Sequence, residues 1–158
     1  MATDLENTGL RHDLDGSGMR IGIVQSRFNE AIGEALLASC LQQLALANVA
    51  DEDIDVFTVP GALETPLMLH EMALTGLFDG LIALGCIIRG ETYHFEVVSN
   101  ESARGISEVQ INTGVPVANA ILTTENEQQA KDRMHIKGGE AAQVIIEMIL
   151  NLKQLEEL

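Results

Sequence analysis

The segment from Ala83 to Glu96 contains the residues of this chain that are best suited to chemistry. It reads Ala-Leu-Gly-Cys-Ile-Ile-Arg-Gly-Glu-Thr-Tyr-His-Phe-Glu, so an apolar run, broken at Gly85, is followed at once by charged and polar side chains. In open parallel α/β sheets, ligands bind beyond the carboxyl ends of the strands, and this pattern is typical of such a site. His94 is the natural proton carrier there, because imidazole titrates near neutral pH.

Polar groups follow the other predicted strands in the same way. They are Ser26–Asn29 after the first strand, Val59–Glu64 after the second, and Asn119 with Thr123–Asn126 after the fourth. Each is weak evidence alone, since Val-Pro-Gly is an ordinary turn and Thr-Thr-Glu-Asn an ordinary helix start. Because the carboxyl ends of parallel strands share one edge, we expect all four groups to converge there.

Four residues in these groups suit the binding of an organic ligand. Phe28 stands in a polar loop, where its ring either stacks on a flat heterocycle or folds under the loop. Gly61 and Ala62 lack bulk, so the backbone can approach a ligand closely. Glu64 can accept hydrogen bonds from hydroxyls, or it can act only as a favourable charge at a helix start.

A phosphate would suit the segment before His94. Gly90, Glu91 and Thr92 are predicted to open a helix whose free N–H groups attract an anion. Arg133 and Lys137 can supply the opposing charge, although a solvated helix end is the alternative for both.

The elements that position these residues alternate between short β-like runs and helical runs. Strands are predicted at 20–25, 54–59, 81–88 and 115–122. Helices are predicted at 30–48, 64–75, 94–111 and 125–133, with a last helix to about 155 after a break at Gly138 and Gly139. This order predicts an α/β, flavodoxin-like fold: a three-layer sandwich with a four-stranded parallel sheet flanked by helices on both faces.

The 158 residues suit one domain with a proper core. Residues 1–18 are polar and without periodicity, which predicts a flexible N-terminal arm, and residues 19–158 are predicted to form the single domain. The last helix carries an apolar arc wider than one sheet would cover. This arc predicts a homo-oligomer, and a helix buried in one larger core is the alternative.

The composition makes some kinds of binding partner unfavourable. A net charge of -15 makes nucleic acid and anionic membrane surfaces poor partners. Cys40 and Cys86 lie in apolar segments without metal-ligand spacing, so we expect buried thiols and no metal site. No apolar run reaches the roughly 18 residues of a membrane helix and the first residues lack a leader pattern, so we expect a cytoplasmic protein.

The order of the motifs resembles the lumazine synthase (6,7-dimethyl-8-ribityllumazine synthase) family. The motifs are Arg-Phe-Asn at 27–29, Val-Pro-Gly-Ala-Leu-Glu at 59–64, Gly-x-x-Ile-Arg-Gly-Glu-Thr-x-His-Phe-Glu at 85–96, Asn-Glu-Ser at 100–102, and Leu-Thr-Thr-Glu-Asn-x-x-Gln-Ala at 122–130, followed by Arg133. The resemblance covers about residues 19–150. Any one motif is common, but the combination in this order is highly specific.

The resemblance implies a reaction. Members of the family condense 5-amino-6-(D-ribitylamino)uracil with 3,4-dihydroxy-2-butanone 4-phosphate, which gives 6,7-dimethyl-8-ribityllumazine, phosphate and water in the penultimate step of riboflavin biosynthesis. It implies no metal or redox cofactor. It also implies a homopentamer or a multiple of it, with sites at the subunit interfaces, and riboflavin synthase as a candidate partner.

The resemblance further implies a role for each site residue. His94 would move protons, and Phe28 would stack on the pyrimidine ring. The residues implied to contact the pyrimidine substrate are Phe28, Ala62, Leu63, Glu64, Cys86, Ile87, Ile88 and Asn119. Those implied to lie around the phosphate are Glu91, Thr92, Arg133 and Lys137. The segment 134–136 that joins Arg133 to Lys137 is shorter than in many relatives.

Two other functions compete with this reaction. A non-catalytic protein of the same fold that binds a flavin or lumazine would need neither His94 nor Arg133, and the presence of both argues against it. An unrelated flavodoxin-like or nucleotide-binding module should carry a glycine-rich phosphate loop after the first strand. Ser26–Asn29 is not such a loop.

Overall fold

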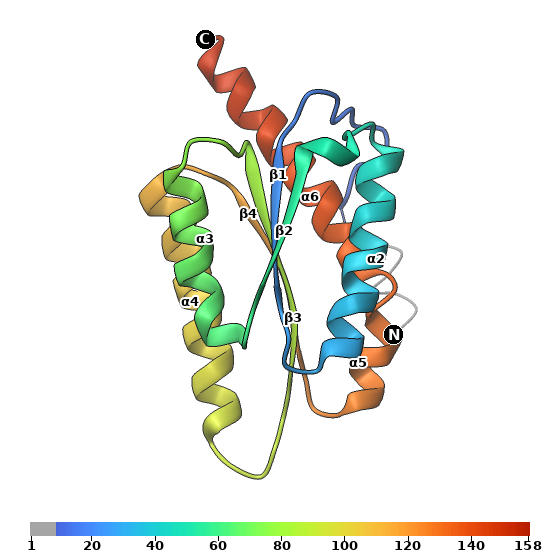
Figure 1. Cartoon of the computed structure of the whole chain (residues 1–158), viewed down its shortest axis with the longest axis vertical. Helices are drawn as coiled ribbons and strands as arrows, with labels where there is room; N and C mark the ends of the chain where they lie inside the picture. The colour runs from blue at the N-terminus through green and yellow to red at the C-terminus, as the bar shows by residue number, and fades with distance from the viewer. Residues whose placement is uncertain (1–8) are drawn as a thin grey trace.

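A four-stranded parallel sheet in the order β2-β1-β3-β4 forms the middle layer of the protein (Figure 1). The computed structural model describes residues 9–158. Its strands are β1 (Ile21–Ser26), β2 (Ile54–Val59), β3 (Gly80–Ile88) and β4 (Val117–Thr124). The predicted α/β fold class with four parallel strands is therefore confirmed.

Helices cover both faces of the sheet. They are α2 (Glu30–Leu46), α3 (Thr65–Leu74), α4 (His94–Thr113), α5 (Glu127–Arg133) and α6 (Lys137–Glu156), with short 3₁₀ turns η1 (Asp51–Asp53) and η2 (Ala62–Glu64). Helices α3 and α4 lie on one face, and α2, α5 and α6 lie on the other (Figure 1). Each face has its own apolar core, of which the larger lies between the sheet and the pair α2 and α6.

The central strands explain why the chain reads as apolar runs. Strand β1 pairs with both β2 and β3, and all six of its residues are buried. Strand β3 is buried along its first eight residues. Strands covered on both faces lose the alternation of apolar and polar residues that marks a half-exposed strand. Because all four strands run the same way, their carboxyl ends meet at one edge, as predicted.

The predicted end of the fourth strand is corrected by the pairing of β3 with β4. The fourth strand was expected at 115–122 but runs to Thr124, because its last two residues pair with Ile87 and Ile88. Gly85 does not break the third strand. A Cβ at Gly85 would collide with the side-chain oxygen of Ser26, so glycine lets the neighbouring strand keep that side chain.

The predicted break at Gly138 and Gly139 is wrong, since both residues lie in the first turn of α6. A Cβ at Gly138 would overlap the backbone carbonyl of Leu36 in α2. The backbone N–H of Gly139 donates to Ser39 Oγ at 2.8 Å. The glycines therefore serve a close contact between two helices, a tertiary constraint that overrides their poor helix propensity.

Most of the apolar arc of α6 is used inside the chain. Its buried side chains, Ala141, Ala142, Ile145, Ile146 and Ile149, belong to the core on the α2 side of the sheet. The alternative of one larger core thus accounts for most of the arc, and the homo-oligomer stays a prediction.

The first eight residues of the predicted arm lie outside the described residues. Within the rest of it, the Gly16 N–H donates to the Ala47 carbonyl at 2.7 Å, and Arg11 Nε lies 3.1 Å from Glu147 Oε1. This part of the segment therefore lies against the C-terminal end of α2 and the middle of α6.

We predict that Gly138→Ala lowers the free energy of unfolding by about 1–3 kcal/mol, because the added methyl group forces α2 and α6 apart. Gly139→Ala is the matched control, since its nearest contact would be a Ser39 hydroxyl at 3.2 Å, and we expect a change within about 1 kcal/mol. Thermal unfolding of the two variants measures the difference. Equal melting temperatures would contradict the close-contact explanation.

Candidate active site

A pocket of ≈ 300 Å³ opens at the carboxyl edge of the sheet, on the side of α4. Its walls come from the β1–α2 loop, the turn after β2, the end of β3 and the first turns of α4. The lining residues are Phe28, Gly61, Ala62, Leu63, Glu64, Cys86, Ile87, Ile88, Gly90, Thr92, His94, Phe95 and Val98. The structure thus brings His94 together with most of the residues predicted to bind the pyrimidine.

The ring of Phe28 is presented at the mouth of this pocket. Backbone hydrogen bonds fix its loop on the end of β2: Arg27 N donates to Val59 O at 2.9 Å, and Phe28 N donates to Pro60 O at 3.1 Å. The Phe28 side chain is 73% exposed, so it does not fold under the loop. Of the two expected arrangements, a ring folded under its loop and a ring open to a ligand, the structure has the open ring, which is available for stacking.

Asn29 holds the same loop to β3, and sequence reasoning missed it. Its backbone has φ 59, a left-handed conformation that Asn tolerates better than most residues. Its side chain does not cap α2, although an Asn before a helix commonly does so. Instead, Asn29 Nδ2 donates to the Cys86 carbonyl at 3.0 Å. The loop that carries Phe28 is therefore fixed to both neighbouring strands.

The turn after β2 presents Glu64 at the start of α3. The Glu64 N–H donates to the Gly61 carbonyl at 3.2 Å, and Pro66 occupies the first turn of the helix, where proline is favourable. A Cβ at Gly61 would lie 3.2 Å from the Glu64 carboxylate, so glycine leaves room for this side chain. Glu64 thus lines the pocket and also sits where the helix dipole favours a negative charge.

His94 is the first residue of α4 and is exposed. The Thr92 hydroxyl accepts a hydrogen bond from the His94 N–H at 3.3 Å, which fixes the turn before the helix. Phe95 and Val98, which the sequence analysis did not select, form the apolar wall beside the imidazole. Glu91 is exposed on the same turn but does not line the pocket. The N–H groups of Glu96 and Val97 donate to the Tyr93 carbonyl, so three of the first four N–H groups of the helix have partners within the chain.

Three predicted site residues lie elsewhere in the chain. Asn119 and Lys137 line a second hollow, of ≈ 400 Å³, between edge strand β4 and α6. Lys137 Nζ is 2.8 Å from Glu140 Oε2. Arg133 ends α5, and its Nη1 donates to the Gln129 carbonyl at 2.9 Å. Since α5 and α6 cover the face opposite α4 (Figure 1), one chain does not bring these three residues to His94.

Burial keeps both cysteines in the thiol form. It raises the pKa of Cys86 to about 11 and that of Cys40 to about 12. Only the thiolate is nucleophilic, so Cys86 contributes its shape and its backbone to the pocket at neutral pH. Among residues 9–158, no three His, Cys, Asp or Glu side chains are grouped so that they could hold a metal ion. None of the helices described is long and apolar enough to cross a membrane.

Comparisons with known proteins agree with one another. The model of the 6,7-dimethyl-8-ribityllumazine synthase family matches residues 18–153. The 6,7-dimethyl-8-ribityllumazine synthase of Methylobacillus flagellatus is 66% identical over 143 residues, which is 90% of this chain and 96% of that protein. The synthase of Paraburkholderia phymatum is 56% identical over 146 residues, 92% of this chain and 85% of the relative. That of Azoarcus sp. is 52% identical over 144 residues, with 91% and 92% covered.

We predict that both thiols react slowly in the folded protein. At pH 7.5 their labelling by a disulfide reagent should be on the order of a hundredfold slower than in the chain unfolded by guanidinium. Because folding raises both pKa values, the neutral thiols favour the folded state fully below about pH 9, and this contribution is lost as pH rises through about 11 and 12. Rapid labelling of Cys86 at neutral pH in a Cys40→Ser variant would contradict the prediction.

Proposed function

This chain belongs to the 6,7-dimethyl-8-ribityllumazine synthase family, and we propose that it condenses 5-amino-6-(D-ribitylamino)uracil with 3,4-dihydroxy-2-butanone 4-phosphate. The family resemblance noted in the motif order is confirmed by the family model and by relatives at up to 66% identity. The observation that carries the proposal is the pocket in which Phe28, Glu64 and His94 meet. The proposed reaction needs an aromatic ring to stack on the pyrimidine, a carboxylate to accept hydrogen bonds from hydroxyls, and a group that carries protons.

The first substrate occupies the part of the pocket between Phe28 and the end of β3. The exposed ring of Phe28 stacks on the pyrimidine, and the backbone of 86–88 meets the polar edge of that ring. Ala62, Leu63 and Glu64 hold the ribityl chain, whose hydroxyls donate to the Glu64 carboxylate. The small side chain of Ala62 lets the ligand approach the backbone closely.

The phosphate of the second substrate is bound at the start of α4. The partial positive charge at the N-terminus of this 20-residue helix favours an anion there. Glu91 and Thr92 stand on the turn that the phosphate meets. Arg133, with Lys137 nearby, supplies the cationic side chains.

His94 moves the protons. The amine nitrogen of the pyrimidine attacks the ketone carbon, and protons must pass to the departing oxygen during imine formation and between nitrogens and oxygens at phosphate loss and ring closure. An imidazole works well at such steps near neutral pH. Much of the acceleration comes from holding the two substrates together, because an amine and a ketone react readily once they are positioned.

The positions of Asn119, Arg133 and Lys137 support an oligomer in which each site takes residues from two chains. These residues face the opposite side of the sheet from His94 in their own chain, so only a neighbouring copy brings them to the pocket. A head-to-tail contact repeated around a closed ring does this, and a pentamer or its multiple is the proposed assembly.

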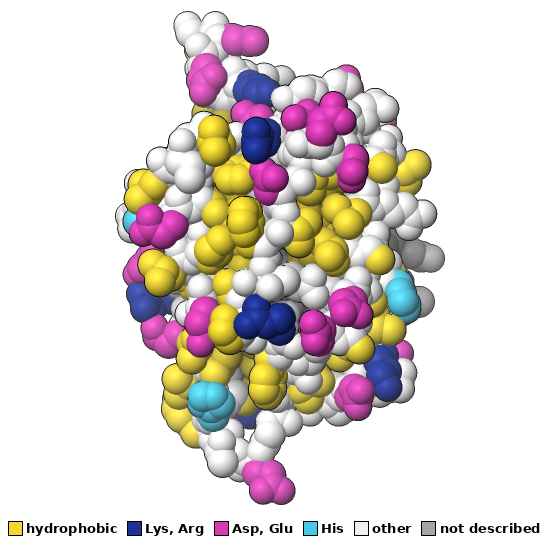
Figure 2. All heavy atoms as spheres, viewed as in Figure 1, with side chains coloured by type: hydrophobic (Ala, Val, Ile, Leu, Met, Phe, Trp, Pro, Cys, Tyr) yellow, Lys and Arg dark blue, Asp and Glu magenta, His cyan; other side chains and the backbone are white. Residues whose placement is uncertain are grey.

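The surface of the chain also suits such an assembly. Edge strand β2 exposes Val56 and Phe57, at 40% and 41%, beside unpaired backbone groups. Figure 2 shows hydrophobic side chains gathered across the middle of the face that β2 crosses. Open edges and apolar patches of this kind are usually covered. Association with riboflavin synthase and a cytoplasmic location stay predictions.

Turnover tests the proposed function directly. The purified protein is mixed with both substrates, and the absorbance of the lumazine is followed above the slow uncatalysed reaction. Saturable turnover would support the proposed condensation reaction. Tight binding of riboflavin or of the lumazine without turnover would instead identify a non-catalytic binding protein of the same fold.

In that assay, His94→Ala should slow the reaction by only about 10- to 100-fold, because positioning supplies most of the acceleration. His70→Ala is the matched control, since His70 lies on α3 outside the pocket, and it should retain full activity. A loss beyond about ten-thousand-fold in single-turnover experiments would show that proton transfer, not positioning, is the main term.

Mixed oligomers test the shared site. We predict that Arg133→Ala chains and His94→Ala chains, each of which is strongly impaired alone, regain about a quarter of the wild-type activity when co-assembled in equal amounts, because about a quarter of the interfaces then pair two intact halves. Light scattering should give five times the 17.1 kDa chain mass or a multiple of it. Activity no higher than the average of the two parent variants would place the whole site within one chain.

A further inference from the structure

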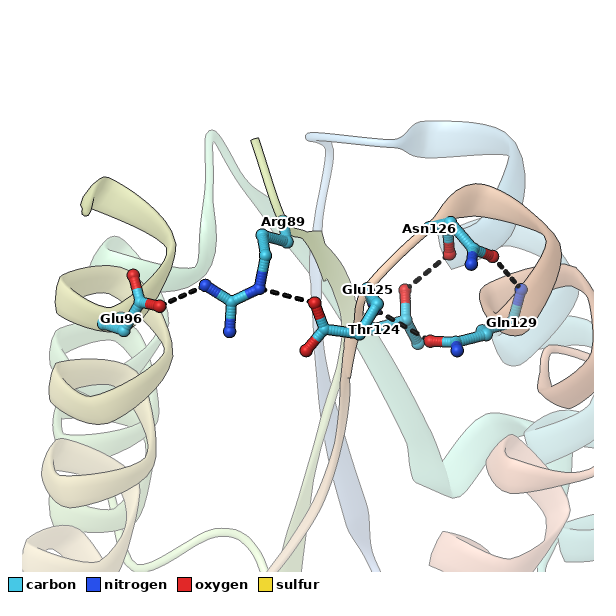
Figure 3. Close-up of polar contacts among 6 residues, drawn as sticks. All are labelled: Arg89, Glu96, Thr124, Glu125, Asn126 and Gln129. Carbon is cyan, nitrogen blue, oxygen red and sulfur yellow. Dashed lines mark hydrogen bonds and ion pairs between the residues drawn. The ribbon is translucent and has the colours of Figure 1, made fainter. Parts of the chain in front are cut away.

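The guanidinium of Arg89 connects two parts of the chain that lie on opposite faces of the sheet. Arg89 directly follows β3, and its Nε donates to Glu125 Oε2 at 2.5 Å, while its Nη1 donates to Glu96 (Figure 3). The guanidinium carbon also lies 4.3 Å from the centre of the Phe95 ring. One side chain therefore contacts both the first turn of α4 and the segment that follows β4.

The contacts on the α4 side lie next to the catalytic imidazole. Phe95 and Glu96 follow His94 in the first turn of the helix, and the Phe95 ring is part of the pocket wall. Arg89 binds the carboxylate of Glu96 and lies over the ring of Phe95. The orientation of this turn thus depends on a side chain that comes from the end of β3.

The contacts on the other side determine where α5 begins. Asn126 Oδ1 accepts from the Gln129 N–H at 2.9 Å, and Gln129 Oε1 accepts from the Glu125 N–H at 2.8 Å, a reciprocal cap on the helix start (Figure 3). The Thr124 hydroxyl donates to the Asn126 carbonyl at 2.9 Å. Glu125 is therefore fixed to the first turn of α5, the helix that ends at Arg133.

We propose that Arg89 is a positioning residue that holds the His94-bearing turn of α4 to the start of α5 across the carboxyl end of the sheet. Its backbone contributes too, since the Arg89 N–H donates to the Thr124 carbonyl at 2.9 Å. The role rests on the proposed function, because it concerns the geometry of that reaction's proton carrier. Within one chain, Arg89 also fixes the His94 pocket relative to α5, the helix whose Arg133 is proposed to enter the pocket of a neighbouring chain.

Arg89 does not bind the phosphate itself, although it directly precedes the Gly90–Thr92 turn. Its charge is balanced by two carboxylates, and it does not line the pocket. The hydrogen bond from Arg89 lowers the pKa of Glu96 below its usual value, so this carboxylate stays ionised and paired at neutral pH. An anion would have to displace a carboxylate to reach the guanidinium.

The contribution of Arg89 is geometric more than energetic. Its side chain is 38% exposed, and exposed ion pairs add little to stability. By contrast, a displacement of about 1 Å at a reacting group can cost about 100-fold in rate. Loss of Arg89 should therefore reduce turnover while leaving the fold intact.

The test compares Arg89→Met with wild type in kinetics and in hydrogen exchange. We expect kcat to fall about tenfold, KM for the butanone phosphate to stay within about threefold, and the amides of residues 94–98 to exchange faster. Arg89→Lys should recover part of kcat, because an ammonium can pair with one carboxylate but lacks the planar fork. Glu125→Gln should reproduce a smaller part of the loss. Melting temperatures should stay within about 4 °C of wild type.

Arg20→Met is the matched control. Arg20 also joins an ion pair, with Asp55 Oδ2 at 2.8 Å, and lies over an aromatic ring, that of Phe78 at 5.7 Å, with 42% of its side chain exposed. It precedes β1, at the other end of the sheet from the pocket. This variant should change neither kcat nor exchange in α4.

Two outcomes would overturn the proposal. A KM for the butanone phosphate more than about tenfold higher in Arg89→Met, with kcat and exchange unchanged, would make Arg89 a substrate ligand. Unchanged kcat and unchanged exchange at 94–98 would remove the positioning role altogether. If wild-type protein itself showed no turnover, the proposed function would fail, whereas the exchange comparison would still report whether Arg89 holds the two helix starts together.

Discussion

The parallel pairing of β1 with both β2 and β3 is the constraint on which the site depends. It directs the carboxyl ends of all four strands to one edge, so loops far apart in sequence become neighbours. The hydrogen bonds that fix these loops, from Phe28 to Pro60 and from Asn29 to Cys86, then run between adjacent strand ends. Two walls of the pocket continue the buried strands β1 and β3, and the loop after β1 is hydrogen-bonded to the turn after β2, so these walls are in place before a ligand binds.

The same sheet also separates the predicted site into two halves. Right-handed crossovers place α3 and α4 on one face and α2 on the other, and α5, which follows the last strand, lies on the α2 face. His94 of α4 and Arg133 of α5 therefore lie on opposite faces of the sheet. A proton carrier and a cationic clamp on opposite faces can act on one substrate only if copies of the chain meet. In the proposed function this division links catalysis to assembly, and Arg89, which spans the end of the sheet, makes the placement of the His94 turn depend on that of α5.

Much of the fold could be predicted from the sequence, because buried parallel strands and amphipathic helices leave distinct apolar patterns. Strand β2 and the starts of α2 and α4 were placed at the observed residues. The errors came from tertiary contacts that leave no local pattern. Gly138 was expected to break a helix, yet its role is to admit the Leu36 carbonyl, and Asn29, which was not selected as a site residue, bonds through its side chain to another strand. The pocket residues converged as expected, whereas the separate location of Asn119 and Lys137 depends on which face each crossover covers.

The charge of the chain limits how a phosphate can be bound. With 24 acidic residues against 9 basic ones, the long-range field repels an anionic substrate, so binding must depend on short-range donors. Near the site, the carboxylates of Glu96 and Glu125 already engage Arg89, and Glu140 lies beside Lys137. At the start of α4 the helix dipole attracts an anion, while the carboxylate of Glu96 in the first turn offsets part of that attraction. In the proposed function the helix start is therefore one part of the phosphate site, and the pairing of Arg89 with Glu96 leaves that arginine to position the helix.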